Sequence, residues 1–420
     1  MNGMKVDFRV QLRLYALTGL AIPALICLAY YSAESLTVAL VGTLLSAAFL
    51  PPANASPLCS LDWVMLLVLA YDIPSLEMSQ YPANGSSFAK TLCCAVLFYV
   101  LVRLTTQRAR RRVAACLFVA AGGVALACFA FSQFAEQVHA IEAAGLSGVV
   151  AFRARLIIVP LPWVLGEWLT LVLLTLPFAM AASVFLWLDQ RRNLAAGAAL
   201  MPAGIMASLL LSCSRAVFWG LIVFTAVAVG TTVVYRTIRI RTALITVASV
   251  LCVIGLVLAG ENAFYPGMME AYSGRHTSQT RSTEGRVAIW KRSAEVFSLS
   301  PIWGVGSGNA PLFLTSSADH EETTGFASRT SSLPLQVLTE KGAIGAALYL
   351  AVLLLAGWEV HRKLRNPTVS LQMKGLTCCL MAGVAAVLFR ELTYSSLLEH
   401  AATAMLFTMC LALLVAEEPA

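Results

Sequence analysis

Apolar runs recur along the whole chain, and short polar or basic segments separate them. A helix of about 20 apolar residues spans the hydrocarbon core of a bilayer. The pattern therefore predicts an all-α membrane protein with about 12 spanning helices. The expected spans are residues 14–31, 36–50, 61–72, 88–102, 113–131, 168–188, 194–211, 216–235, 243–260, 343–360, 375–389 and 397–415. The polar residues 132–162 are expected to hold a short helix lying on the membrane surface.

One long polar segment, residues 261–342, interrupts this pattern, and it contains seven Lys or Arg residues. We expect helices 1–9 in residues 1–260, a partly helical loop domain in 261–342, and helices 10–12 in 343–420. Within the loop, residues 284–298 have the spacing of an amphipathic helix. Its predicted apolar face consists of Val287, Trp290, Ala294 and Phe297.

Composition agrees with a membrane protein. The chain is 59% hydrophobic and 12% charged, whereas an average soluble domain is about 25% charged. The net charge of +7 does not predict a nucleic-acid partner, because basic residues in such proteins gather at helix ends. Most of the 11 Cys lie inside apolar runs without CxxC spacing, so we expect no metal site and no cofactor.

Four basic clusters indicate how the chain is oriented. Residues 103–112, 191–192, 236–241 and 361–365 all fall on the cytoplasmic side if both termini are cytoplasmic. Arg215 and the long loop then lie on the opposite side of the membrane. Arg215 is an isolated charge between two apolar runs, and such a charge is costly unless it has a partner or a task. Arg215 is interpreted either as a residue that sets the membrane topology or as a ligand for diphosphate. A planar guanidinium suits the second role, because it forms two parallel hydrogen bonds with phosphate oxygens.

Two further features have structural alternatives. Residues 304–309 form a glycine-rich segment that is neither a Walker nor a Rossmann motif, and we expect it to be a structural turn. Arg390 and Glu391 end an apolar run, and they are either a neutralised pair in the bundle or part of a site.

Three motifs follow one another in the middle of the chain. They are Ser214-Arg215 at the start of a span; Gly285-Arg286 with Trp290, followed by the turn Pro301–Asn309; and Leu335-Gln336 with Glu340, Gly342 and Gly345. In this combination the chain resembles the O-antigen ligase and O-antigen polymerase superfamily, whose fold is GT-C-like.

The resemblance implies a metal-independent, inverting glycosyltransferase of the bacterial inner membrane. Such an enzyme takes a glycan from undecaprenyl diphosphate on the periplasmic side and transfers it to an acceptor glycan or to lipid A–core. By the resemblance, Arg215 and Arg286 would bind the diphosphate, and Arg286 would also act in catalysis by stabilising the leaving group. Arg390, Glu391 and Trp290 would support this site.

The chain departs from the family at one position. Many members carry a His eleven residues before the glycine that opens the next span, and here that position is Ser331. His320 is the alternative candidate for the catalytic base, and Arg329 for a third phosphate contact. The missing His favours a polymerase over a ligase.

Two other function classes stay open from sequence. A 12-span transporter would have a central cytoplasmic linker or internal repeats, neither of which is seen. A flippase-like or scaffolding protein would tolerate replacement of Arg215 and of Arg286.

Overall fold

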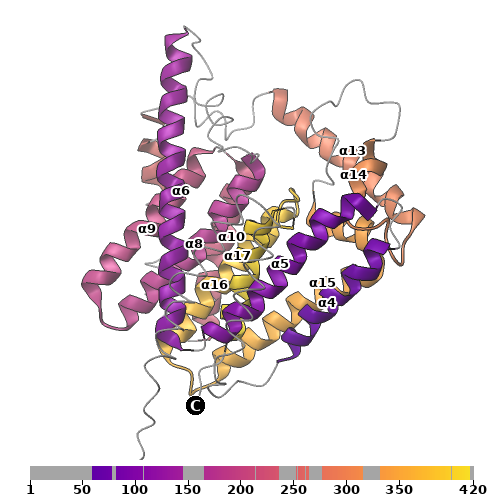
Figure 1. Ribbon diagram of the computed structural model, residues 1–420. Helices are drawn as coiled ribbons and strands as arrows, with labels where there is room; N and C mark the ends of the chain where they lie inside the picture. Colours follow the sequence, from indigo (N-terminus) through magenta and orange to yellow (C-terminus); the bar gives the residue numbers. More distant parts are fainter. Residues whose placement is uncertain are drawn as a thin grey trace, which may run out of the picture.

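The chain is described from a computed structural model. The described residues are 59–77, 82–106, 108–144, 165–212, 214–235, 252, 254–260, 262–263, 277–315, 332–398 and 400–416. Over these ranges the chain is helical, and none of the described residues is in a strand. Figure 1 shows the helices α4 (Ser60–Glu77), α5 (Pro82–Thr105), α6 (Ala109–Ala143), α8 (Leu165–Leu188), α9 (Arg192–Leu211), α10 (Arg215–Val234), α13 (Thr277–Leu299), α14 (Ala310–Thr315), α15 (Leu333–Arg365), α16 (Leu371–Glu391) and α17 (Ala401–Val415).

Six helices among the described residues are long and apolar enough to cross a membrane: α6, α8, α9, α10, α15 and α16. The apolar α17 is shorter. These helices agree with the predicted multi-pass membrane class. The expected spans 14–31, 36–50 and most of 243–260 lie outside the described residues. The spans expected at 61–72 and 88–102 correspond to α4 and α5, which are helical but are not among the six.

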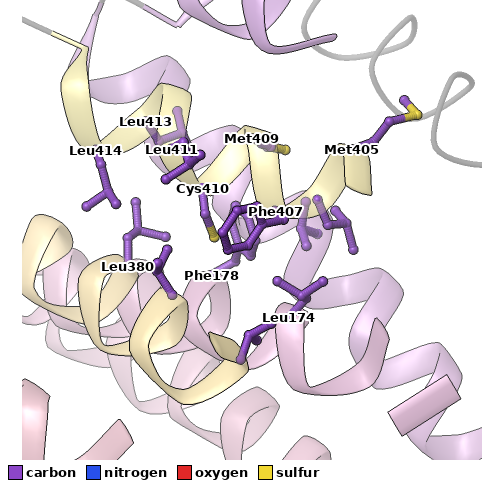
Figure 2. Close-up of a cluster of buried hydrophobic side chains, with 14 of the residues drawn as sticks. Leu174, Phe178, Leu380, Met405, Phe407, Met409, Cys410, Leu411, Leu413 and Leu414 are labelled. Atoms are coloured by element: carbon purple, nitrogen blue, oxygen red, sulfur yellow. The ribbon is translucent and has the colours of Figure 1, made fainter. Parts of the chain in front are cut away.

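Helix α17 forms the centre of the bundle. Every residue of α17 is buried, and the helix packs against α5, α8, α15 and α16. Figure 2 shows its side chains meeting Leu174 and Phe178 of α8 and Leu380 of α16. This apolar packing fixes where the ends of the surrounding helices lie, and the candidate site is built at one of those ends.

Glycines on α16 and α10 set the register of three neighbouring helices. A Cβ on Gly383 of α16 would clash with Pro177 of α8, so the two backbones approach closely, as small residues allow in membrane helices. Gly220 of α10 faces the carbonyl oxygen of Ala386 of α16, 3.5 Å from the position of a Cβ. Because each residue adds 1.5 Å along a helix, this register brings the first turns of α8 and α10 level with the end of α16.

The opposite end of the bundle carries basic residues that bind the end of α17. Arg103 of α5 donates to the carbonyl oxygen of Val415 at 3.4 Å. Lys363 of α15 donates to the carbonyl oxygens of Leu414 and Ala416, each at 3.1 Å. Cations at a helix C-terminus are favourable, because the last carbonyl groups carry partial negative charge. Arg103 is also paired with Asp62 at 3.2 Å and buried, so it has a structural role besides any effect on orientation.

The predicted end of a span at residue 131 was wrong. Helix α6 continues to Ala143, so residues 132–143 extend a spanning helix, and residues 145–162 of the expected surface segment lie outside the described residues. Helix α15 begins at Leu333 but is divided by non-helical backbone at Gly342, so its second part begins at 343, where the span was expected to begin. Its first turns are amphipathic and pack against α13 and α14, and hydropathy alone does not detect such a segment.

Candidate functional site

The glycine-rich segment is a structural turn, as predicted. It joins α13 to α14 and binds the kink of α15 through its backbone. The hydrogen bonds run from Val305 N to Thr339 O at 2.8 Å, from Gly306 N to Glu340 O at 3.0 Å, and from Ala343 N to Pro301 O at 2.8 Å. Two of the three motifs therefore form one unit, which attaches α13 to the transmembrane bundle.

Two glycines make this close backbone contact feasible. Gly304 has a φ of +76° and Gly342 a φ of +64°, values that favour glycine because it has no Cβ. A Cβ on Gly304 would clash with the backbone of Glu340, and one on Gly342 would clash with the carbonyl group of Ile302. The glycines are therefore required by the docking of the turn.

A polar network extends from this turn toward the end of α16. Glu340 accepts hydrogen bonds from the backbone N–H groups of Gly308 and Ala310 and from the side chain of Gln336. Gln336 in turn accepts a hydrogen bond from Ser395, which lies in the segment between α16 and α17. The Gln and Glu of the third motif thus connect the turn with residues 392–400.

Helix α13 presents Arg286 toward the protein. The amphipathic helix predicted at 284–298 is confirmed, but its predicted apolar face was wrong, because Val287 and Trp290 are exposed. The packed face instead contains Ile289, Ser293 and Val296. Arg286 precedes Ile289 by three residues and therefore lies on this face. A buried serine on this face explains why the hydrophobic pattern alone misplaced it.

Arg215 is the first residue of α10, as the sequence indicated. Ser214 is the N-cap and has an extended backbone. The side chain of Arg215 is exposed at this helix end. The register of α10 against α16 places Arg215 and Arg390 at about the same level, since they lie five and four residues beyond the facing pair Gly220 and Ala386.

Arg390 and Glu391 end α16 and form a buried ion pair at 3.0 Å. The Glu391 carboxylate also accepts hydrogen bonds from the backbone of Ser396 at 2.8 Å and of Leu397 at 3.0 Å. Arg390 additionally donates to Thr170 of α8. Glu391 therefore holds residues 392–398 in a non-helical segment, and α17 begins at Ala401 and not at the expected residue 397.

The three arginines come together at this end of the bundle. Burial lowers the pKa of the Arg286 guanidinium, and the positive charge of Arg215 lowers that pKa further, while Tyr394 raises it. Arg390 interacts electrostatically with Arg286, and its guanidinium lies 5.1 Å from the centre of the Tyr394 ring, within cation–π range.

We call Arg215, Arg286, Arg390, Glu391 and Tyr394 the arginine cluster. It contains three guanidiniums and one carboxylate, which leaves an excess of positive charge. Like charges held together in a partly buried site oppose one another. An anion with several oxygen acceptors would relieve this repulsion, and phosphate groups are such anions.

The remaining sequence candidates have different outcomes. His320 and Arg329 lie outside the described residues, so their roles stay predictions. Trp290 follows Arg286 by one turn of α13 and is 36% exposed. Within the described part of the chain, no three His, Cys, Asp or Glu side chains are grouped as metal ligands would be.

Sequence reasoning missed a second polar pair beside the cluster. His400, the N-cap of α17, contacts Glu167 of α8 with 2.6 Å between Nε2 and Oε2. Thr170, Tyr394 and Ser396 were missed as well. The sequence carries one signal for the pair: Glu167 and His400 each stand directly before an apolar run.

The middle of the chain is similar to a known protein family. Residues 203–350 match a family model described as O-Antigen ligase. A search of curated proteins finds no match. The matched residues contain Arg215, Arg286, the glycine-rich turn and the third motif. This match over residues 203–350 confirms the resemblance of the chain to the O-antigen ligase and polymerase superfamily.

Proposed function

We propose that this protein transfers a glycan from undecaprenyl diphosphate to an acceptor sugar, and that the arginine cluster binds the diphosphate. The observation that carries the proposal is the convergence of Arg215, Arg286 and Arg390 from three separate helices at one end of the bundle. Two of these residues lie in the segment that matches the O-antigen ligase family. The donor itself is inferred from the resemblance to that superfamily.

The chemistry of the cluster suits a diphosphate leaving group. A diphosphate that links a lipid to a sugar carries negative charge on both phosphates at neutral pH. Guanidiniums form bidentate, charge-assisted hydrogen bonds with phosphate oxygens. Arg215 and Arg286 would contact the diphosphate. Arg390 is buried against Glu391 and Thr170, so it would add positive charge to the site without touching the diphosphate.

The proposed reaction is a single displacement at the anomeric carbon. The oxygen of the acceptor hydroxyl forms the new glycosidic bond, and its proton passes to a base. The bond between the anomeric carbon and the diphosphate breaks, and the electron pair stays on the diphosphate oxygen. Guanidiniums placed at this oxygen stabilise the negative charge that develops in the transition state. The anomeric configuration is inverted.

The position of the cluster also fits the expected orientation. The described basic segments around Arg103, Arg191 and Lys363 lie at the ends of α5, α8 and α15, away from the cluster. In an inner membrane with those segments on the cytoplasmic side, the cluster faces the periplasm. Both termini are then cytoplasmic.

The acceptor decides between two forms of the proposal. The absence of a family-typical His at Ser331 favours a polymerase that joins repeat units. The description of the matching family model favours a ligase that transfers the glycan to lipid A–core. We take the polymerase as the first form and the ligase as the second.

The experiment is a transfer assay with the full-length protein in detergent. The donor is the undecaprenyl-diphosphate glycan extracted from a deletion strain of the producing bacterium, offered alone and then with lipid A–core, with EDTA present. Arg215→Ala and Arg286→Ala are compared with Arg292→Ala. Arg292 is a matched control, because it lies on α13 like Arg286 but pairs on the surface with Glu295 at 3.0 Å.

We expect the two cluster variants to lose transfer and Arg292→Ala to retain it. Longer glycan from donor alone indicates a polymerase, and product only with lipid A–core indicates a ligase. Wild-type transfer rates in both Arg215→Ala and Arg286→Ala would refute the proposed site.

A further inference from the structure

His400 and Glu167 form a polar pair at the side of the arginine cluster. Their side chains meet at 2.6 Å, and the Glu167 side chain is 1% exposed whereas that of His400 is 31% exposed. A buried carboxylate beside an imidazole orients the ring and stabilises the imidazolium that forms when the ring accepts a proton. A partly exposed ring can reach a substrate.

The pair is close to the cluster through two independent connections. Glu167 and Thr170 are three residues apart on α8, which places their Cβ atoms about 5–6 Å apart on one face. Thr170 contacts Arg390 and donates to Glu391 at 3.1 Å. On the other side, His400 follows the segment that Glu391 holds at Ser396. These connections place the imidazole at the same end of the bundle as Arg390 and Glu391 of the arginine cluster.

The reaction needs a base at this place. The acceptor oxygen must approach the anomeric carbon from the side opposite the diphosphate and must lose its proton as the bond forms. The usual position for a His in the family is Ser331 in this chain. A histidine supplied by the start of α17 would fill the same chemical role from a different element.

We infer that His400, held by Glu167, is the base that accepts the proton of the acceptor hydroxyl. In this step the acceptor oxygen bonds to the anomeric carbon, its proton passes to the imidazole, and the electron pair of the broken bond leaves with the diphosphate. The Nε2–H group of His400 donates to Glu167, which places the accepted proton on Nδ1. Glu167 is a positioning residue. The inference rests on the proposed function.

The test compares His400→Ala, His361→Ala and Glu167→Gln with the wild type in the transfer assay described above. Turnover, the KM for donor and thermal stability are measured for each protein. His400→Ala is assayed with and without free imidazole, since a small base can restore catalysis where only a proton acceptor has been removed. His361 is the control, because it is a histidine near the end of α15, where it contacts Tyr235 at 2.7 Å and has no part in the proposed site.

A general base contributes about 10²–10⁴-fold to a rate. We therefore expect His400→Ala to lower turnover by at least about 10²-fold, with an unchanged KM for donor and partial recovery in imidazole. Glu167→Gln lowers turnover less, and His361→Ala leaves it unchanged. A purely structural pair would instead lower thermal stability, and imidazole would not restore activity.

Two outcomes overturn the inference. One is a His400→Ala protein that turns over like the wild type. The other is a loss of activity in His400→Ala that imidazole does not restore and that comes with lower thermal stability. Either result, together with inactive Arg215→Ala and Arg286→Ala variants, leaves the proposed function standing. An inactive wild type refutes both.

Discussion

Substitution of Gly342 by alanine should detach the glycine-rich turn from α15. The backbone of Gly342 has φ +64° and ψ −166°, a region that is accessible essentially only to glycine, and a side chain there costs about 1–3 kcal/mol. The added Cβ would also clash with the carbonyl group of Ile302. Moving the turn away breaks the hydrogen bonds that Ala343 and Ile344 donate to the turn, at a cost of about 1 kcal/mol each.

These contributions sum to about 3–5 kcal/mol. Since about 1.4 kcal/mol corresponds to a tenfold change in an equilibrium, the open state of the turn should become about 10² to 4 × 10³-fold more populated. Helix α13 ends at the turn and carries Lys291, which is exposed, and Arg292, which is half-buried. Opening of the turn removes the anchor of α13, so the helix can unfold locally and its backbone becomes accessible to trypsin at these residues.

The assay is limited trypsin digestion of the detergent-solubilised protein, with cleavage after Arg292 followed by mass spectrometry. When opening and closing are fast relative to cleavage, the cleavage rate follows the population of the open state. We expect Gly342→Ala to be cleaved about 10²-fold faster than the wild type. Gly357→Ala is the matched control on the same helix, because a Cβ there meets nothing within 4 Å. Equal cleavage rates for Gly342→Ala and Gly357→Ala would refute the reasoning.

Two further substitutions test the buried polar groups. Glu391→Gln should destabilise the segment between α16 and α17 by about 3–5 kcal/mol, because it leaves the buried Arg390 guanidinium without its counter-charge. The thermal unfolding midpoint of the variant should therefore fall, and an unchanged midpoint would contradict this. Lys341→Met should be similarly destabilising, because Lys341 is buried against Asp72. The double variant Asp72→Asn/Lys341→Met should recover part of that stability, and no recovery would argue against a paired charge.

The sequence predicted the members of the site better than their arrangement. Arg215 and Arg390 stood out because charges are costly in an apolar run, whereas Arg286 was named from the resemblance to the superfamily. Their convergence could not be predicted, because it depends on the register that Gly383 and Gly220 set between neighbouring helices. Hydropathy gives the length of a helix but not which residue of a neighbouring helix it faces.

Side chains that bind the backbone explain the other differences. The start of α17 was misplaced because Glu391 holds the N–H groups of Ser396 and Leu397, which keeps those residues out of the helix. Non-helical backbone at such depth is tolerated only where the protein satisfies its polar groups. His400 was overlooked for the same reason, because the position of its ring depends on this segment.

The central claim is that Arg215 and Arg286 act on the same diphosphate. A double-mutant cycle of the transfer rate with Arg215→Ala, Arg286→Ala and the double variant tests it most directly. Hydrogen bonds to charged groups contribute about 1.5–3 kcal/mol each, so each single variant should slow transfer by about 10²-fold. We expect the double variant to be far less impaired than the product of the two single effects, because both guanidiniums hold one anion. Effects that multiply independently, or single variants with wild-type rates, would contradict it.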